Sequence, residues 1–419
     1  MNRRLFIGSA AAAGLAGLRN ARLQAQETHP VPDAIKKLKP MTAGIQPITD
    51  DERKQRIEKA RKLMRDRKID AMVMEGGANM FYFTGTRWPQ AERPALLVLP
   101  AKGELTWVVP QTEQDRAKTS IKMGTDIRPW ADADGPYRRL SQALKDLNST
   151  GRIGIEEKTR YAVFEGLRKE LPDAELTSAD TVTIGCRVIK SLPEILLLQR
   201  ANDITIAAYQ AAFTTLREGM TQGELSANIA AAYQALGSQG NAMIIFGKYT
   251  AFPHGSVVPQ TLREGDVVLV DDGCSVEGYQ SDITRTTVFG KPTARQKEIW
   301  NLERKAQDAA LAAAKPGNTC EMVDAAARKV ITDFGFGPGY KVPGLPHRTG
   351  HGIGLEGHEW TNLVKGNKTK IEPGMCFSNE PTIAIYGEFG IRLEDCMYIG
   401  ANGAEMFTRQ SPAIDQPFG

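Results

Sequence analysis

The stretch that decides the fold is residues 266–289, which read DVVLVDDGCSVEGYQSDITRTTVF. Val267 to Val270 have strand composition, Glu277-Gly278 supplies turn chemistry, and Ile283 to Phe289 read as a returning β-branched strand. Two such strands joined by a short turn predict an antiparallel β-hairpin.

This hairpin carries two aspartates that are candidate metal ligands. With the turn near Val276-Glu277, Asp271 and Asp282 come opposite each other on neighbouring strands. Two carboxylates held this close repel each other, and their pKa values separate unless a cation lies between them. A hard divalent metal with oxygen ligands is the usual solution. For this stretch alone, a solvated acidic hairpin is an equally good interpretation.

Three further segments add histidines and carboxylates to the candidate site. They are His347-Arg-Thr-Gly-His351-Gly-Ile-Gly-Leu-Glu-Gly-His358-Glu, Ser378-Asn-Glu380-Pro381 and Gly390-Ile-Arg392-Leu-Glu394-Asp. The chain has five histidines, and apart from His29 they all lie in segments that carry the carboxylates: His254, His347, His351 and His358. Histidines scattered over a core or a surface would not concentrate in this way.

In combination, these motifs resemble the metallopeptidases of the "pita-bread" fold, a family that includes methionine aminopeptidase, aminopeptidase P and prolidase. The family's metal ligands are Asp, Asp, His, Glu and Glu in chain order. The resemblance assigns them to Asp271, Asp282, His351, Glu380 and Glu394. The two aspartates are eleven residues apart, the spacing that the family uses. The resemblance covers roughly residues 195–415 closely and the preceding part of the chain more loosely.

The resemblance also implies the fold, which is of the α/β (α+β) class. A creatinase-like α/β domain is expected at residues 49–188, after an irregular, proline-rich lead-in at 27–48. A catalytic pita-bread domain with a pseudo-two-fold curved antiparallel sheet is expected at residues 189–419. In the first domain, strand-like runs predict four strands, at Ile69–Met74, Met80–Thr84, Ala95–Leu99 and Leu105–Val109.

Capping boxes, in which a Ser or Thr precedes a Glu or Gln by three residues, predict where four helices begin. They start at Thr49, Ser191, Thr221 and Thr293, and the helices are expected to end near Arg67, Gly219, Gly237 and Pro316. Further helices are expected near residues 138–147, 160–171 and 321–333. In the second domain one helix pair precedes the hairpin and another follows it, which indicates an internal two-fold repeat.

By the same resemblance, the site holds two divalent metal ions, expected to be Mn²⁺, with Zn²⁺, Co²⁺ and Fe²⁺ as alternatives. Asp282 and Glu394 would bridge the ions. Glu380 would take a proton from the attacking water and pass it to the leaving nitrogen. His254 and His358 would contact the substrate and stabilise the tetrahedral oxyanion.

Two more residues match positions near the proline side of the family's pocket. They are His347 and Arg392, and the resemblance implies that they bind substrate. For these two, and for His254 and His358, the alternative is a structural role in holding the ligands in place.

The sequence departs from the family pattern at two positions. Asp272 stands where the family often has a small residue. Because strand alternation points it away from Asp271, a surface ion pair is expected there rather than a further ligand. Tyr386 stands two residues further along the chain than the tyrosine of the family's Glu-Pro-Gly-x-Tyr motif, so it is assigned no role.

The resemblance favours an Xaa-Pro aminopeptidase, which removes the N-terminal residue from peptides with proline in second position. The alternatives are a prolidase acting on Xaa-Pro dipeptides and a metal-dependent lyase or hydrolase of a small non-peptide substrate. Aminopeptidase P is preferred because the N-terminal segment, described next, predicts export from the cytoplasm. An exported enzyme meets longer peptides before dipeptides. The expected partners are a peptide substrate and further copies of the chain, in a homodimer or a larger homo-oligomer.

Residues 1–26 read as a twin-arginine signal peptide. Arg3-Arg4 precedes Leu5–Leu18, an apolar stretch of fourteen residues that is too short to span a bilayer comfortably. Export to the periplasm is therefore expected. The segment has four arginines and no acid, and the whole chain carries +4. The mature protein is then near neutral, which gives no support for binding to nucleic acid or to a membrane.

The five cysteines are Cys186, Cys274, Cys320, Cys376 and Cys396. Their number is odd, no Cys-x-x-Cys occurs, and most lie in apolar stretches. We expect buried free thiols, with a single disulfide as the alternative.

Overall fold

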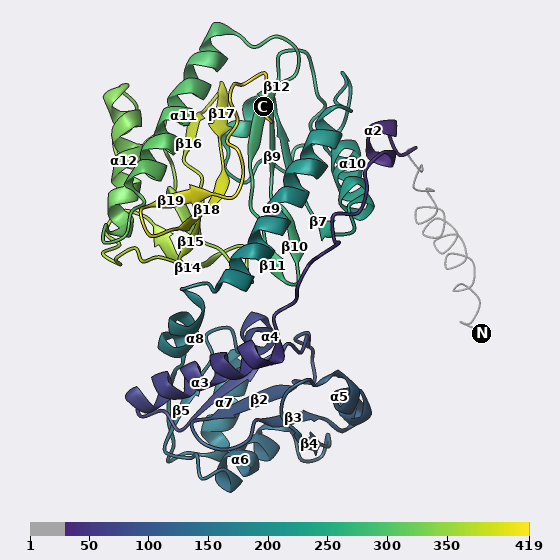
Figure 1. The fold of residues 1–419 in the computed structure, drawn as a ribbon, viewed down its shortest axis with the longest axis vertical. Coiled ribbons are helices and arrows are strands. Elements are labelled where there is room, and N and C mark those ends of the chain that lie inside the picture. Colours follow the sequence, from purple (N-terminus) through teal and green to yellow (C-terminus); the bar gives the residue numbers. More distant parts are fainter. Residues whose placement is uncertain (1–29, 419) are drawn as a thin grey trace, which may run out of the picture.

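The computed structural model describes residues 30–418, which form two domains, one above the other in Figure 1. The predicted signal peptide at 1–26 and the first residues of the lead-in lie outside the described residues. The rest of the lead-in places a short helix, α2 (Asp33–Lys36), against α9 (Leu192–Phe213) and α10 (Gln222–Ala235) of the second domain. Between residues 30 and 418, no helix is long and apolar enough to cross a membrane.

The first domain is built on a six-stranded mixed sheet with the order β4-β3-β2-β1-β5-β6. The strands are β1 (Ala71–Glu75), β2 (Leu96–Pro100), β3 (Thr106–Pro110), β4 (Asp126–Trp130), β5 (Arg152–Ile155) and β6 (Glu175–Ser178). Both faces of β1 are buried, since Met72 and Met74 join the core on the side of α3 and Val73 joins the core on the opposite face. A strand covered on both faces explains the continuous apolar run in the sequence.

Helices cover both faces of this sheet. They are α3 (Asp50–Asp66), α4 (Ala78–Thr84), η1 (Gln111–Glu113), α5 (Gln114–Ser120), α6 (Pro136–Asp146), α7 (Tyr161–Glu170) and α8 (Asp180–Arg187). The side chain of Thr49 caps α3 as predicted, by accepting from the N–H of Glu52 at 3.2 Å. The helices predicted near 138–147 and 160–171 are confirmed as α6 and α7.

The predicted strand at Met80–Thr84 is wrong, because this segment forms helix α4. Its aromatic residues have high strand propensity, but propensity yields to packing here. Met80 and Phe83 are both fully buried, and their spacing of three places them on one face of a helical turn that packs against α3. Gly85, at φ 67°, ends the helix in the left-handed conformation.

The second domain carries two helix pairs, α9 with α10 and α11 (Ala294–Ala313) with α12 (Cys320–Asp333). The capping boxes predicted at Ser191, Thr221 and Thr293 are all present. Helix α9 ends at Phe213, earlier than the predicted Gly219. The hydroxyls of the two threonines that follow Phe213 donate to helix carbonyls at 2.7 and 2.6 Å, and such side chains compete with the helical backbone bonds.

Antiparallel strands lie between the helix pairs (Figure 1). Those of the first half are β7 (Gln239–Gly240), β8 (Met243–Phe246), β9 (Val267–Asp271), β10 (Cys274–Val276), β11 (Tyr279–Gln280) and β12 (Arg285–Val288). Those of the second half are β13 (Gly350–Gly352), β14 (Glu359–Leu363), β15 (Cys376–Asn379), β16 (Thr382–Ile385), β17 (Phe389–Arg392), β18 (Asp395–Ile399) and β19 (Ala404–Met406). The predicted pita-bread architecture, with two halves of helix pair and antiparallel strands, is confirmed.

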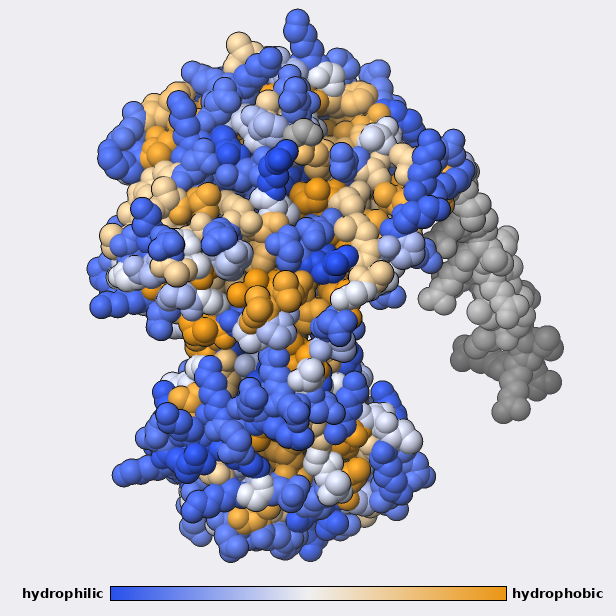
Figure 2. Space-filling model, in the orientation of Figure 1, coloured by the Kyte–Doolittle hydropathy of each residue, from blue (hydrophilic) through white to orange (hydrophobic). Residues whose placement is uncertain are grey.

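Apolar packing continues from the first domain into the second. One buried cluster contains Met72 and Phe83 of the first domain together with Leu197 and Tyr279 of the second. Figure 2 shows apolar residues gathered where the two domains meet. Arg56 adds a polar link, since it lies over the Tyr82 ring at 4.1 Å and donates to Tyr279 Oη at 3.2 Å. The two domains therefore share a core at their junction.

The cysteines agree with the sequence prediction. All five are buried and free, and burial raises the pKa of the Cys186 thiol to about 11. Thiols held in this protonated form are poor nucleophiles, so the cysteines act as small apolar residues of the core.

Candidate metal centre

A cavity of about 740 Å³ in the second domain gathers the residues singled out in the sequence. All five predicted ligands line it, together with three further histidines: Asp271, Asp282, His351, Glu380 and Glu394, with His254, His347 and His358. The ligand candidates come from the hairpin of the first half and from the strands of the second half. The two halves of the repeat therefore meet at this cavity.

The hairpin places its two aspartates as diagonal neighbours rather than directly opposite each other. The pairs β9–β12 and β10–β11 share a register centred on Glu277-Gly278, one residue later than predicted. Both turn residues have positive φ values, 50° and 93°, as in a two-residue type I′ turn. In this register Thr284 lies opposite Asp271, and Asp282 lies two residues further along the same face.

Donor atoms converge in three groups, in each of which they all lie within 4.8 Å of one another. The groups are Asp271, Asp282 and Glu394; His351, Glu380 and Glu394; and Asp282, His351 and His358. Asp282, Glu394 and His351 each belong to two groups, and of these three only the carboxylates have two oxygens with which to bridge a pair of ions. Burial and then the neighbouring carboxylates raise the pKa values of both well above the ordinary range. Four carboxylates, of which Glu380 and Glu394 are buried and Asp271 and Asp282 partly buried, lie beside imidazole nitrogen and fit a pair of divalent cations.

Two hydroxyls that the sequence analysis missed orient the carboxylates. Thr284 Oγ1 lies 2.7 Å from Asp271 Oδ1 and 2.7 Å from Glu394 Oε2. Ser378 Oγ donates to Glu380 Oε1 at 3.2 Å and accepts from the N–H of His351 at 3.0 Å. Each hydroxyl stands two residues from a ligand, inside a motif already quoted. That position in the sequence was the available signal for a supporting role.

His358 and His254 lie on the cavity as exposed side chains. The His358 ring meets the His351 ring edge-on, with centroids 4.1 Å apart. Partial desolvation of the ring by the surrounding protein and then the charge of His351 lower the pKa of His358 to about 4, so this imidazole is neutral at pH 7. His254 follows the 3₁₀ helix η2 (Gly247–Ala251) in the loop before β9. Both side chains are exposed to the cavity, and their contact with a substrate stays a prediction.

His347 and Arg392 are held by the protein itself. His347 Nδ1 lies 2.6 Å from Arg348 O, and its Nε2 lies 2.9 Å from Thr382 Oγ1. Arg392 is ion-paired with Asp271, and its Nε donates to Thr284 Oγ1 at 3.0 Å. Its Nη1 donates to the carbonyl of Pro253, beside His254, at 3.1 Å. This geometry gives both side chains a structural role, and their contact with substrate stays a prediction.

The expected surface ion pair of Asp272 is wrong. Asp272 has φ 101°, and this conformation breaks the strand alternation on which the expectation depended. Its side chain lines the same cavity as Asp271, and within residues 30–418 it forms no ion pair. Burial and then the charge of Asp271 raise the pKa of Asp272 to about 6. Its carbonyl accepts from Tyr209 Oη at 3.0 Å and from the N–H of Ile283 at 3.1 Å, which holds the strained backbone in place.

Arg348 is a cavity-lining residue that the sequence analysis passed over. It stands between His347 and the ligand His351 in a quoted motif, and its side chain lines the cavity. Its nearest carboxylate oxygen is Glu380 Oε1, 4.0 Å from Nε. A basic side chain inside the quoted motif was the signal available in the sequence.

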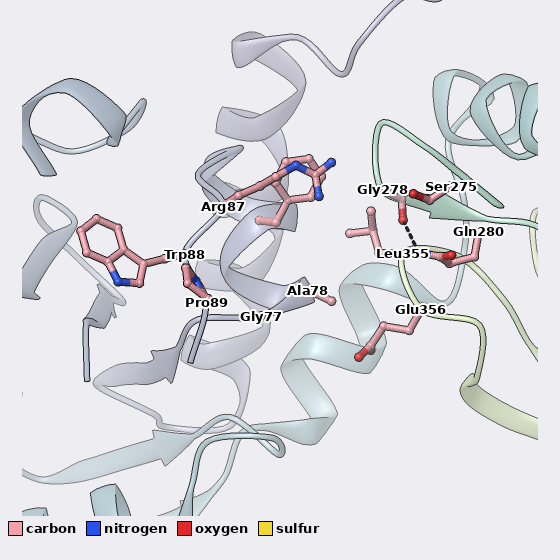
Figure 3. A pocket seen from close by; sticks show the side chains of 11 residues that line it. Gly77, Ala78, Arg87, Trp88, Pro89, Ser275, Gly278, Gln280, Leu355 and Glu356 are labelled. Atoms are coloured by element: carbon pink, nitrogen blue, oxygen red, sulfur yellow. Dashed lines mark hydrogen bonds between the residues drawn. The ribbon is translucent and has the colours of Figure 1, made fainter. Parts of the chain in front are cut away.

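A second concavity lies at the junction of the domains (Figure 3) and has a volume of about 490 Å³. It is bounded by the hairpin turn at Gly278, by Leu355 and Glu356, and by Arg87, which lies over the Phe81 ring at 4.0 Å. None of the predicted ligands or histidines lines it. The chemistry that the sequence indicates is therefore placed in the larger cavity of the second domain.

The sequence matches two protein families. Metallopeptidase family M24 matches residues 197–401, and the Creatinase/Prolidase N-terminal domain matches residues 56–189. Among known proteins, the Xaa-Pro dipeptidase of Pyrococcus furiosus is 32% identical over 359 residues, which cover 85% of this chain and 98% of that protein.

Solved structures of dipeptidases and prolidases have a similar fold. The dipeptidase PepE of Mycobacterium ulcerans matches with a TM-score of 0.79 at 30% identity, over 87% of this chain and 97% of that one. A prolidase from Thermococcus sibiricus matches with a TM-score of 0.79 at 28% identity, over 85% of this chain and 96% of that one. The similarity extends over both domains.

Proposed function

The chain belongs to metallopeptidase family M24, and from this premise we propose that it is an Xaa-Pro dipeptidase, a metal-dependent hydrolase of dipeptides with proline in second position. The observation that carries the proposal is the similarity to an Xaa-Pro dipeptidase over 98% of that protein's length. It supports the prolidase alternative better than aminopeptidase P. The preference for aminopeptidase P depended on the predicted export, and the segment concerned lies outside the described residues.

The ligand set defines what the metal site would supply. Two divalent ions, when bound, provide Lewis acidity that polarises the scissile carbonyl and acidifies water. The residues proposed to hold them are Asp271, Asp282, His351, Glu380 and Glu394. We propose Mn²⁺ as the metal.

Glu380 is proposed to move the proton. Burial alone would raise its pKa, but the contact with His351 and the charge of Arg392 outweigh burial and lower it, so Glu380 is a carboxylate at neutral pH. It can take a proton from the attacking water and give it to the leaving proline nitrogen. That nitrogen has no hydrogen of its own in the peptide bond. His254 and His358 are proposed to donate hydrogen bonds to the oxyanion.

The test compares dipeptide and tripeptide substrates. Protein loaded with Mn²⁺ is assayed on Leu-Pro and on Leu-Pro-Gly, with Leu-Ala as the control for proline specificity. We expect kcat/KM for Leu-Pro to exceed the value for Leu-Pro-Gly by about tenfold or more, which equals about 1.4 kcal/mol of transition-state stabilisation. A higher kcat/KM on the tripeptide would restore aminopeptidase P, and activity on neither prolyl peptide would overturn both.

A further inference from the structure

We propose that Arg348 binds the free carboxylate of the dipeptide and so selects dipeptides over longer peptides. This inference rests on the proposed function. An Xaa-Pro dipeptide ends in a carboxylate directly after the proline, whereas a longer peptide has a neutral amide there. An enzyme that prefers dipeptides therefore needs a cation with free donors on that side of its cavity.

Apart from His254 and His358, which are proposed to serve the oxyanion, the other basic groups of the cavity are already engaged. Two arginines line it, and among the described residues no lysine does. Arg392 directs its donors at Asp271, at Thr284 and at the carbonyl of Pro253. Both ring nitrogens of His347 have partners. Arg392 was the residue that the sequence analysis placed near the proline, and these contacts leave Arg348 for the carboxylate.

The Arg348 side chain is half-buried and has no hydrogen-bond partner among the described residues, and its one carboxylate neighbour is Glu380 at 4.0 Å. It is 33% exposed, and in the part of the chain that the structure describes none of its nitrogens has a hydrogen-bond acceptor. Its Nε is buried without a partner, which is costly for a charged donor. A carboxylate that accepts from Nε and one Nη in the bidentate manner of arginine would remove this cost.

Arg348 also lies at a suitable distance from the reacting bond. Its Nε is 4.0 Å from Glu380 Oε1, the carboxylate proposed to serve the scissile bond. Consecutive residues of a peptide are spaced by about 3.8 Å, so the terminal carboxylate of a dipeptide lies one residue from the scissile carbonyl. The guanidinium is therefore about one residue length from the group that acts on the bond.

The same proximity suggests a competing role, in which Arg348 only adjusts the charge of Glu380 and the metal ligands. The two roles differ in one measurable respect. An arginine that binds the carboxylate affects substrates that have one, whereas an arginine that acts on Glu380 affects the acid and its neutral amide equally.

The kinetic experiment uses Mn²⁺-loaded full-length protein with Leu-Pro and its C-terminal amide as substrates. The variants are Arg348→Gln, Arg348→Lys and, as a matched control, Arg87→Gln at the second concavity. For Arg348→Gln we expect kcat/KM to fall roughly 10- to 100-fold on Leu-Pro and little on the amide. Arg348→Lys should recover part of the loss, and Arg87→Gln should behave as wild type. Equal losses on acid and amide, or no loss on either, would overturn the assignment.

A binding measurement separates this inference from the proposed function. Calorimetry with L-proline and L-prolinamide, together with metal analysis of each variant, needs no turnover. We expect the wild type to bind proline more tightly than prolinamide and Arg348→Gln to lose that difference at unchanged metal content. If the wild type cleaves no Xaa-Pro dipeptide yet shows this preference, the proposed function fails and the carboxylate site stands. Equal binding of the two ligands by the wild type would refute the site.

Discussion

Among single residues, Thr284 shows how the metal ligands are held in position. Its hydroxyl contacts Asp271 and Glu394 at 2.7 Å each and accepts from Arg392 Nε at 3.0 Å. Thr284→Val keeps the shape and removes the hydroxyl. We expect it to weaken metal affinity roughly 10- to 100-fold, measured by titration of metal-free protein. Thr284→Ser keeps the hydroxyl and should stay within a few-fold of wild type, so equal losses in both variants would contradict the argument.

Asp282 is one of the two carboxylates proposed to bridge the metal ions. It belongs to two of the three donor groups, so its removal affects both proposed ion positions. We expect Asp282→Ala to lose both metal and peptidase activity. Elemental analysis of purified protein is the measurement. A variant that keeps wild-type metal content and activity would show that Asp282 is not a bridging ligand.

The sequence predicts site residues only where they lie in motifs that follow one another along the chain in the family's order. All five ligands and the three further histidines reach one cavity, because their motifs could be matched in order. Asp272 was misplaced since its φ of 101° breaks an alternation that assumes regular strand geometry. Arg348 was missed because its significance depends on Arg392 being engaged elsewhere, which is a fact of the folded structure alone.

At the scale of elements, the hairpin turn ties the metal centre to the first domain. Gly278 has φ 93°, and a Cβ there would lie 3.1 Å from Phe81 Cε1 and 3.2 Å from Arg87 Nη2. We expect Gly278→Ala to lower unfolding stability by roughly 1–3 kcal/mol, from backbone strain and crowding together. Gly317→Ala is the matched control, since Gly317 has φ 88° and nothing within 4 Å of an added Cβ.

Thermal unfolding of both variants separates the two causes. Gly317→Ala should show the cost of backbone strain alone, and the additional loss in Gly278→Ala should report the contact with the first domain. Equal losses would mean that the turn does not depend on that contact.

Element boundaries were predictable where a side chain marks them. The capping boxes at Ser191, Thr221 and Thr293 fix three helix starts, because the bonds that form them are local. Segment Met80–Thr84 was assigned to the wrong class, since its helical form depends on burial against α3, which is set by the tertiary fold. The exposed edge strand β6 has no apolar alternation to reveal it.

On the scale of the whole molecule, buried ion pairs join the first domain to the segment that carries His358. Glu359 lies beside His358 in the chain and is ion-paired with Arg187 at the end of α8 and with Lys190, at 2.9 Å from its Nζ. Arg187 also donates to Asn79 Oδ1 at 2.9 Å. Because these contacts position the loop of a proposed catalytic histidine, the first domain contributes to the site without lining the cavity.

Replacing Glu359 tests this link through the pH dependence of stability. The side chains of Glu359, Arg187 and Lys190 are 6%, 8% and 2% exposed. Glu359→Gln therefore leaves the buried Lys190 without a carboxylate partner and leaves Arg187 with Glu356 alone, at 3.0 Å. We expect a loss of roughly 3–5 kcal/mol at pH 7, with a lower kcat as the His358 loop loosens. Glu58→Gln, at a carboxylate that is 62% exposed, is the control and should change stability little.

The sign of the pH effect follows from the Glu359 pKa. Burial alone would raise it, but Lys190 and Arg187 lower it to about 2, against an ordinary value of 4.5. The stability that the carboxylate contributes is therefore fully present above pH 4.5 and is lost as the pH falls toward 2. The glutamine variant does not titrate here, so the gap between wild type and variant should narrow by about 2 kcal/mol from pH 7 to pH 3. Denaturant unfolding at both pH values measures the gap, and a constant gap would exclude the buried ion pairs as its source.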